Sequence, residues 1–385
     1  TENQVLAISA TFNDPSSGSG VVRRELYYRQ GGETAWLTPV NLESGSYSIA
    51  SSYVKSSGVE YYIEAEDVAG NIRKLPNEGF YSISVTIPSG IPGSRKWPTG
   101  IPNGATVADY QLISFPANPA NNTPTDVLVT NTIKNLGAYD DTKWRFFTYS
   151  ANAWVEFANI SKIESGVGYF IIVKDADQNI NTGQASSVAT DEPYQINLPA
   201  GEWVMIGNPF DFEIPLPNVY DQDSVSIEGN PNFYTWNGEW VAATVLKPWQ
   251  GYIYKSTIGG QLFMNPRKQN GGQARIAYQE EIELIEDEWL IDIDVKNGFA
   301  NDRSNRIGVL TDALDQYDEW DAFEPPIVPG GVSLRIDNTH WDVAKDIYTT
   351  DIKSVSEQGH FWDLNVVAQD ADRNVIVTFD GISDI

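Results

Sequence analysis

The feature that most constrains this sequence is an internal duplication in its middle part. Three stretches recur in the same order, pairing residues 110–116 with 203–209, 146–154 with 233–240, and 168–171 with 251–254. The separation between matched positions shrinks along the repeat, so the insertions fall in loops and the strands are kept. Each copy of such a unit supplies a face to bury against its neighbour, which is a structural role rather than a chemical one.

Length and composition predict several folded β modules. A chain of 385 residues is too long for one core and predicts two to four domains. The hydrophobic fraction of 41% excludes wholesale disorder, and the abundance of Trp, Tyr, Thr and Val favours strands. The absence of cysteine excludes disulfides, thiolate metal sites and a cysteine nucleophile. We therefore expect an all-β fold of sandwich-type modules in series, one of them internally duplicated.

Charge narrows the range of partners. A net charge of −27 repels nucleic acid phosphates and anionic membrane surfaces, and most of the excess lies after Arg275. No apolar run approaches the roughly 20 residues that span a bilayer. The sequence opens on Thr1 without a basic-then-apolar leader, so we expect a processed or excised soluble fragment, with no nucleic acid partner and no membrane insertion.

The first part of the chain predicts a β-sandwich over residues 1–88. Short alternating strands are expected at 6–12, 21–28, 46–50, 59–65 and 81–86, with turn residues between them. Residues 58–71 resemble the penultimate strand and turn of bacterial immunoglobulin-like or fibronectin type III-like modules, in which a tyrosine pair precedes Asp-x-Ala-Gly-Asn. The resemblance implies that Gly70 and Asn71 supply a hairpin turn. That fold hosts adhesion, spacing and ligand binding alike, so it does not name a role.

Three further segments follow. Residues 89–109 are rich in Pro, Gly and Ser and predict a linker. Residues 110–270 form the duplicated β domain, with repeat units at about 110–174 and 203–256, and residues 275–385 form an acidic β-sandwich.

The last two segments carry a second resemblance. Residues 198–210 and 244–252 resemble paired β modules near the C-terminal ends of large secreted proteins of the Bacteroidetes, exported by the type IX system. Residues 318–326, 332–335 and 348–352 are similar to the β-sandwich that often precedes the sorting domain in such proteins, although the sequence stops at Ile385, where a sorting domain would be expected to begin. The resemblance implies an extracellular or cell-surface location, and as partners other domains of the same large protein or surface and polysaccharide components.

Two kinds of acidic pattern are weak candidates for calcium, the one cofactor considered. Two Asp-x-Asp-x-Asn runs match the first ligands of a calcium loop but lack its later Gly and Glu, and polar hairpin turns between apolar strands are the favoured explanation. A spaced acidic series ends at Glu324 before two prolines, and a solvated loop anchored by Tyr317, Trp320 and Phe323 is its alternative explanation. The candidate metal ligands are Asp175, Asp177, Asn179, Asp312, Asp315, Asp318, Asp321, Asp370, Asp372 and Asn374.

The repeat tryptophans are weak candidates for ligand binding. Trp154, Trp236, Trp240 and Trp249 are of the type that stacks on sugar rings, yet their recurrence in both copies also fits core packing. Enzymatic signals are thin, because the only histidines are His340 and His360 and no catalytic motif surrounds them. We expect a non-catalytic extracellular fragment that serves as a structural spacer, adhesion or attachment region. The alternative is a carbohydrate-binding accessory region of a secreted hydrolase.

Overall fold

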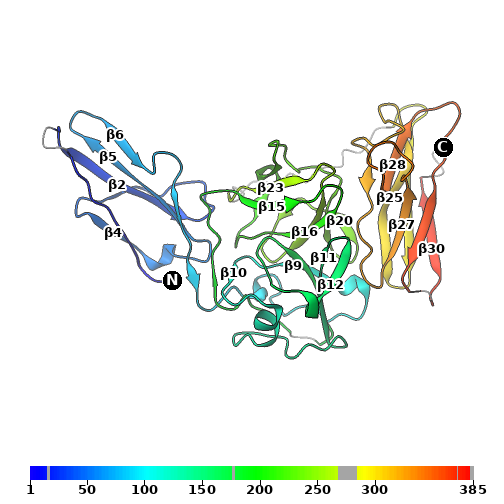
Figure 1. The fold of residues 1–385 in the computed structure, drawn as a ribbon, viewed down its shortest axis with the longest axis horizontal. Coiled ribbons are helices and arrows are strands. Elements are labelled where there is room, and N and C mark those ends of the chain that lie inside the picture. Colours follow the sequence, from blue (N-terminus) through cyan, green and yellow to red (C-terminus); the bar gives the residue numbers. More distant parts are fainter. Residues whose placement is uncertain (15–17, 176–177, 268–283, 371, 382–385) are drawn as a thin grey trace.

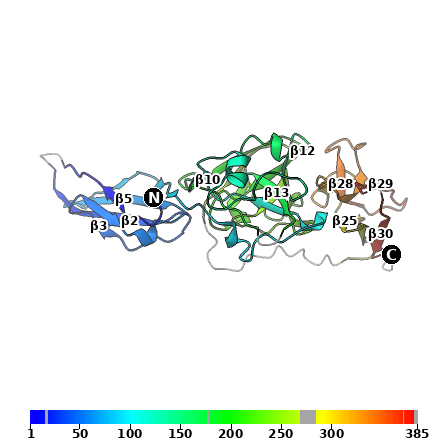
Figure 2. The same cartoon turned by 90° about the horizontal axis from the view of Figure 1, so that it is seen from below.

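The computed structural model describes residues 1–14, 18–175, 178–267, 284–370 and 372–381. Strands hold 42% of the residues and helical turns 6%, which confirms the all-β prediction. The N-terminal module, the duplicated unit and the C-terminal sheet follow one another along the long axis of the molecule (Figure 1, Figure 2). Helical segments among the described residues are single turns at Ser51–Tyr53, Gly93–Arg95, Val107–Asp109, Thr125–Val129, Phe157–Asn159 and Leu216–Asn218. None of these segments has the length or apolar character to cross a membrane.

The N-terminal module packs two antiparallel sheets against each other. β1 pairs with β4, and β2 and β5 form the centre of the larger sheet with β3, β6 and β7 at its edges. Alternation along β2 and β5 buries Leu26, Tyr28 and Ile63 against Ile8 and Ile49 of the smaller sheet. The strands are β1 Leu6–Ser9, β2 Val21–Gln30, β3 Val40–Asn41, β4 Ser46–Ile49, β5 Val59–Asp67, β6 Ile72–Leu75 and β7 Tyr81–Ile83.

The turn predicted at Gly70 and Asn71 connects β5 to β6. Gly70 has a φ of +82°, which favours glycine, and the Asn71 backbone N–H donates to the Asp67 carboxylate over 2.8 Å.

Residues 89–109, which the composition predicts to be a linker, pack instead on the first repeat. Ile91, Trp97 and Ile101 are buried in one core with Phe115 and Trp249. The preceding strand β8 (Thr86–Ile87) pairs with β14 (Ala185–Ser186), which in turn pairs with β10 (Asn118–Pro119). The Pro-rich and Gly-rich composition therefore shapes an irregular but buried path, and its three large apolar side chains hold it in place.

Each copy of the repeat forms a four-stranded antiparallel sheet with the same strand order. The first sheet runs β9 Gln111–Ser114, β13 Gly168–Val173, β11 Trp144–Ser150 and β12 Ala153–Glu156. The second runs β16 Trp203–Gly207, β22 Gly251–Lys255, β19 Phe233–Trp236 and β20 Trp240–Ala242. Smaller pairings join β17 Ile214–Pro215 to β21 Val245–Leu246, and place β23 Gly260–Met264 between β15 Tyr194–Leu198 and β18 Val219–Asp221.

Register and side-chain bonding agree between the copies. Gly168 lies opposite Ser114 and Gly251 opposite Gly207, which are the pairs that the sequence alignment matches. The Tyr169 hydroxyl accepts from the Glu164 backbone N–H over 3.0 Å, and the Tyr252 hydroxyl accepts from the Lys247 N–H over 2.6 Å. The duplicated sequence thus corresponds to duplicated geometry.

The two copies touch each other through reciprocal glycines. A Cβ atom on Gly168 would lie 2.8 Å from the Ile206 carbonyl oxygen, and one on Gly251 would lie 2.5 Å from the Ile113 carbonyl oxygen. Ile113 and Ile206 are matched positions of the repeat. Only glycine permits backbone to approach so closely, so the two sheets interlock at equivalent points.

The C-terminal part is a seven-stranded sheet in the order β29, β27, β28, β25, β24 and β30, with β26 also paired to β28. The β25 and β28 pair is parallel and the other pairs are antiparallel. The strands are β24 Trp289–Asn297, β25 Ala300–Leu310, β26 Ala322–Phe323, β27 Val332–Asp337, β28 Ile347–Ser354, β29 Leu364–Ala368 and β30 Val375–Asp380. Its core joins that of the repeats in one apolar cluster that includes Phe170, Ile253, Ile293 and Leu334.

Candidate functional site: the seam between the duplicated unit and the C-terminal sheet

Three indoles of the duplicated unit hold one loop of the C-terminal sheet. Trp154 Nε1 donates to the Ile327 carbonyl over 2.8 Å, Trp240 Nε1 to the Pro326 carbonyl over 3.2 Å, and Trp203 Nε1 to the Glu324 carbonyl over 3.0 Å. Trp154 and Trp240 are matched positions on β12 and β20, so both copies of the repeat contribute the same contact. We call this junction the C-terminal seam.

Polar contacts extend the C-terminal seam beyond the indoles. The Lys255 ammonium is 4% exposed and lies 2.5 Å from the Asp346 carboxylate, while Phe323 N–H donates to the Asn232 side-chain oxygen over 2.8 Å. The Ser304 hydroxyl donates to the Trp240 carbonyl over 2.9 Å. Each of these contacts joins the second copy of the repeat to the C-terminal sheet.

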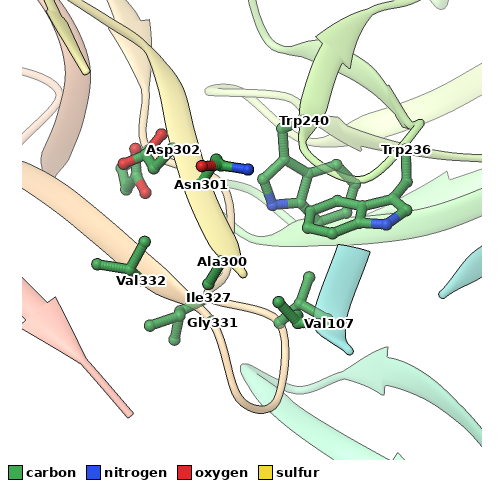
Figure 3. A pocket seen from close by; sticks show the side chains of 11 residues that line it. Val107, Trp236, Trp240, Ala300, Asn301, Asp302, Ile327, Gly331 and Val332 are labelled. Atoms are coloured by element: carbon green, nitrogen blue, oxygen red, sulfur yellow. The ribbon is translucent and has the colours of Figure 1, made fainter. Parts of the chain in front are cut away.

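A small cavity lies within the C-terminal seam. Figure 3 shows Trp236 and Trp240 on one side of it and Ala300, Asp302 and Val332 on the other. Its volume is about 20 Å³, which accommodates a single water molecule. A cavity of this size cannot admit a sugar ring, because small-molecule pockets enclose roughly 300–1,000 Å³.

Two carboxyl groups line this cavity. The Leu334 backbone N–H donates to Asp302 over 2.6 Å, yet burial dominates and raises the pKa of Asp302 to about 6. Burial, with the nearby Asp302 charge adding to it, raises the pKa of Glu324 well above its ordinary value. Glu324 Oε2 is buried and has no hydrogen-bond partner in the described residues. Burial in the cavity therefore shifts both carboxyl groups toward their protonated forms.

The four candidate sugar-binding tryptophans lie in two different environments. Trp154, Trp236 and Trp240 are half-buried at the C-terminal seam. Trp249 is fully buried inside the duplicated unit, with its ring centroid 5.2 Å from that of Phe115 and 6.3 Å from that of Trp97. The structure therefore brings three of them together and leaves Trp249 apart as a core residue.

The acidic series of residues 312–324 satisfies backbone donors rather than converging. Asp315 accepts from Ser354 N–H over 3.1 Å, Asp318 accepts from Leu314 and Trp320 N–H, and the buried Asp321 accepts from Ile352 N–H over 3.0 Å. Asp312 is exposed. These carboxylates shape the loop as hydrogen-bond acceptors.

The two Asp-x-Asp-x-Asn runs also make turn contacts. Asp370 accepts from Asp372 N–H over 3.2 Å and pairs with Arg373 over 2.8 Å, and Asn374 is exposed. In the other run Asp175 is exposed and Asn179 is half-buried, while Asp177 lies outside the described residues. Across the part of the chain that the structure describes, no group of three or more His, Cys, Asp or Glu side chains is arranged to hold a metal ion.

Sequence reasoning missed Trp203 and Asp302 as members of this site. Trp203 aligns with Tyr110, so the repeat marked the position as aromatic without indicating that its N–H would reach Glu324. Nothing in the acidic C-terminal sequence distinguishes Asp302 from the other carboxylates around it.

Comparison with known proteins adds no assignment, because no protein-family model, curated protein or solved structure matches this chain.

Proposed function

We propose that this chain is a non-catalytic, rigid structural spacer or attachment region of a larger extracellular or cell-surface protein. The observation that carries the proposal is the use of Trp154, Trp203 and Trp240 to bind backbone carbonyls of the neighbouring part of the same chain. These indoles, which could otherwise have formed a recognition surface, bind the C-terminal sheet to the duplicated unit instead. Aromatic rings in such a seam supply a large apolar contact, and each indole N–H adds a directional bond.

The junction at the other end of the duplicated unit supports the same proposal. Glu60 of the N-terminal module is fully buried between Arg29, at 2.5 Å, and Arg267 of the duplicated unit, at 3.2 Å. Asp211 of the duplicated unit contacts Ser56 and Arg95. We call this junction the N-terminal seam. Two seams of this kind give a spacer a defined length and direction, which a flexible linker does not provide.

A distance measurement across the C-terminal seam tests the rigidity that the proposal requires. The absence of natural cysteine allows spin labels to be placed on Lys134→Cys and Glu357→Cys, two exposed positions on either side of the seam. We expect a single narrow distance distribution by pulsed electron resonance. The same pair in denaturant gives the broad reference, and a native distribution of that breadth would contradict a rigid spacer.

A polysaccharide-binding screen of the intact chain separates the spacer from the alternative, a carbohydrate-binding accessory region. We expect no saturable binding. Binding that Trp154→Ala abolishes would transfer the site to sugar recognition and overturn the proposal. Lys134→Ala, at an exposed position, is the control substitution.

The proposal includes calcium as an ion that stabilises the folded chain. Thermal unfolding with added calcium, and then with excess chelator, tests this role. Binding to the folded state raises the transition temperature. A rise of several degrees that Asp318→Asn removes would place the ion at the acidic loop. An unchanged transition would leave the backbone contacts of Asp315, Asp318 and Asp321 as the reason for these carboxylates.

A further inference from the structure

Three buried side chains with complementary chemistry meet in the C-terminal sheet. Asn338 is 2% exposed, Asp351 is 0% exposed and Lys353 is 8% exposed. Asn338 Nδ2 donates to Asp351 Oδ2 over 2.9 Å, and Lys353 Nζ lies 3.5 Å from the same oxygen. The carboxamide of Asn338 and the amine of Lys353 thus both contact the same carboxyl oxygen of Asp351.

The strands account for this convergence. Asp351 and Lys353 are two residues apart on β28 and therefore project from the same face of the sheet. Asn338 directly follows β27, which pairs with β28. The loop between β27 and β28 also contacts this group, since the centre of the Trp341 ring lies 5.8 Å from Lys353 Nζ.

An aromatic shell separates the three side chains from water. Trp341 is 2% exposed, and the Trp362 ring centre lies 5.4 Å from Lys353 Nζ. Trp362 Nε1 donates to the Asp351 backbone carbonyl over 3.2 Å, which fixes the indole over the group. Such surroundings exclude water that would compete with the amine for the carboxamide carbon.

One atom of the group has no structural explanation. Asp351 Oδ1 is buried and has no hydrogen-bond partner among the described residues. Burial, opposed in part by Asn338, Lys353 and Trp362, raises the pKa of Asp351. A buried carboxyl oxygen without a hydrogen-bond partner destabilises the fold, so its presence calls for an explanation. A role in proton transfer is one that this carboxyl group suits.

We propose that Lys353 and Asn338 become joined by an isopeptide bond that forms within the folded chain, with Asp351 as the proton carrier. The inference goes beyond the spacer function, because it assigns a covalent modification to residues that take no part in either seam.

The step balances without an added reagent. Asp351 takes a proton from the Lys353 ammonium, and the neutral amine attacks Cγ of Asn338. The new bond is Nζ–Cγ and the bond that breaks is Cγ–Nδ2. Protons from Nζ pass through Asp351 to Nδ2, which leaves as ammonia and departs as ammonium after taking up the remaining proton. Asn338 Nδ2 and Lys353 Nζ both lie within 3.5 Å of Asp351 Oδ2, and this shared neighbour holds the two reacting groups near each other.

Other buried lysines lack this combination. Lys96 Nζ donates to the backbone carbonyls of Leu112 and Trp249, and Lys255 pairs with Asp346. Among the ion pairs of the described residues, only that of Lys353 involves a carboxylate that also accepts from a carboxamide side chain.

The mass of the intact, folded chain tests the proposal directly. We expect it to be lower than the sequence mass by one ammonia, and we expect proteolysis to release a branched peptide that contains both Asn338 and Lys353. Lys353→Met and Asp351→Asn are each expected to restore the full mass.

Two controls keep the result interpretable. Succinimide formation at an Asn-Gly pair such as Asn237–Gly238 also releases ammonia, but it leaves linear peptides. The peptide map of the unsubstituted chain does not depend on whether a variant folds. A folded chain that keeps its full sequence mass, with Asn338 and Lys353 in separate peptides after prolonged incubation, overturns the proposal.

Discussion

The two seams of this molecule treat their most buried carboxyl groups in opposite ways. At the N-terminal seam a buried carboxylate is compensated, because Glu60 contacts Arg29, Arg267 and the Gly32 backbone N–H. At the C-terminal seam an apolar core continues from one part into the next, and the carboxyl groups of Asp302 and Glu324 have no cation within ion-pair distance among the described residues.

This difference determines how each seam can fail. A compensated buried charge becomes costly when one of its partners is removed. An uncompensated carboxyl group is tolerated while it is protonated and becomes costly when it ionises. The N-terminal seam should therefore be sensitive to substitution of its charged partners, and the C-terminal seam to a rise in pH that ionises its carboxyl groups.

The largest expected effect is that of Glu60→Gln. It leaves the buried Arg29 and the half-buried Arg267 without a carboxylate between them, and we expect a loss of about 3–5 kcal/mol in the unfolding free energy of the N-terminal transition. Urea unfolding followed by intrinsic fluorescence measures it. Glu64→Gln is the matched control, since Glu64 lies on the same strand but is half-buried and pairs with the half-buried Arg23, so that its loss should cost no more than about 1 kcal/mol. Equal losses in the two variants would remove the distinction between the seams.

The second effect is the pH dependence of the C-terminal seam. The folded-state pKa of Asp302 is raised from 3.8 to about 6, so its contribution to stability is complete below about pH 4 and is lost as the pH rises through 6. The full loss is on the order of 3 kcal/mol. Unfolding free energies measured across this range should fall with pH more steeply in the unsubstituted chain than in Asp302→Asn. The same slope in both would exclude Asp302 as its source.

The third effect isolates one indole hydrogen bond. Trp240→Phe leaves the Pro326 carbonyl without its donor and should cost about 1–3 kcal/mol, beyond the lost ring contact. Trp236→Phe is the control, because Trp236 lies on the same hairpin, is also half-buried and has an Nε1 without a partner in the described residues. We expect calorimetry to show the larger fall in transition temperature for Trp240→Phe. The reverse order would mean that ring packing, and not the N–H bond, sets the strength of the C-terminal seam.

The smallest effect concerns the rim of the same seam. Arg303 lies 3.4 Å from Glu239 and is more than half exposed. Arg303→Gln should lower stability by less than about 1 kcal/mol, and the difference should vanish in high salt. A salt-independent loss would indicate a packing role for the arginine stem.

The repeat was predictable from sequence because its signal is local. Positions such as Gly168 and Gly251 can be matched by comparing the two segments of the sequence directly. Alternation within a strand then indicates which face is buried. The N-terminal strands were predictable for the same reason. The burial of residues 89–109 could not be predicted, since the positions of Ile91, Trp97 and Ile101 follow neither a strand nor a helix period and only the fold shows what they pack against.

The seams could not be predicted because their contacts join distant parts of the chain. Trp154 and Ile327 are 173 residues apart, and a tryptophan that stacks on sugar has the same local sequence as one that binds a carbonyl. The acidic loop shows a similar ambiguity, because Asp318 is suited equally to a cation and to the two backbone N–H groups that it accepts from. Residue type sets what a side chain can bind, and the tertiary fold decides which partner it meets.

The reciprocal glycine contact says something about the history of the middle of the molecule. Gly168 meets the strand that holds Ile206, and Gly251 meets the strand that holds Ile113, so each copy gives the other the contact that it receives. This is the relation between the subunits of a two-fold symmetric dimer. The duplicated unit has the geometry of such a dimer fused into one polypeptide, and a polypeptide carrying a single copy would expose a face already shaped to bind its twin.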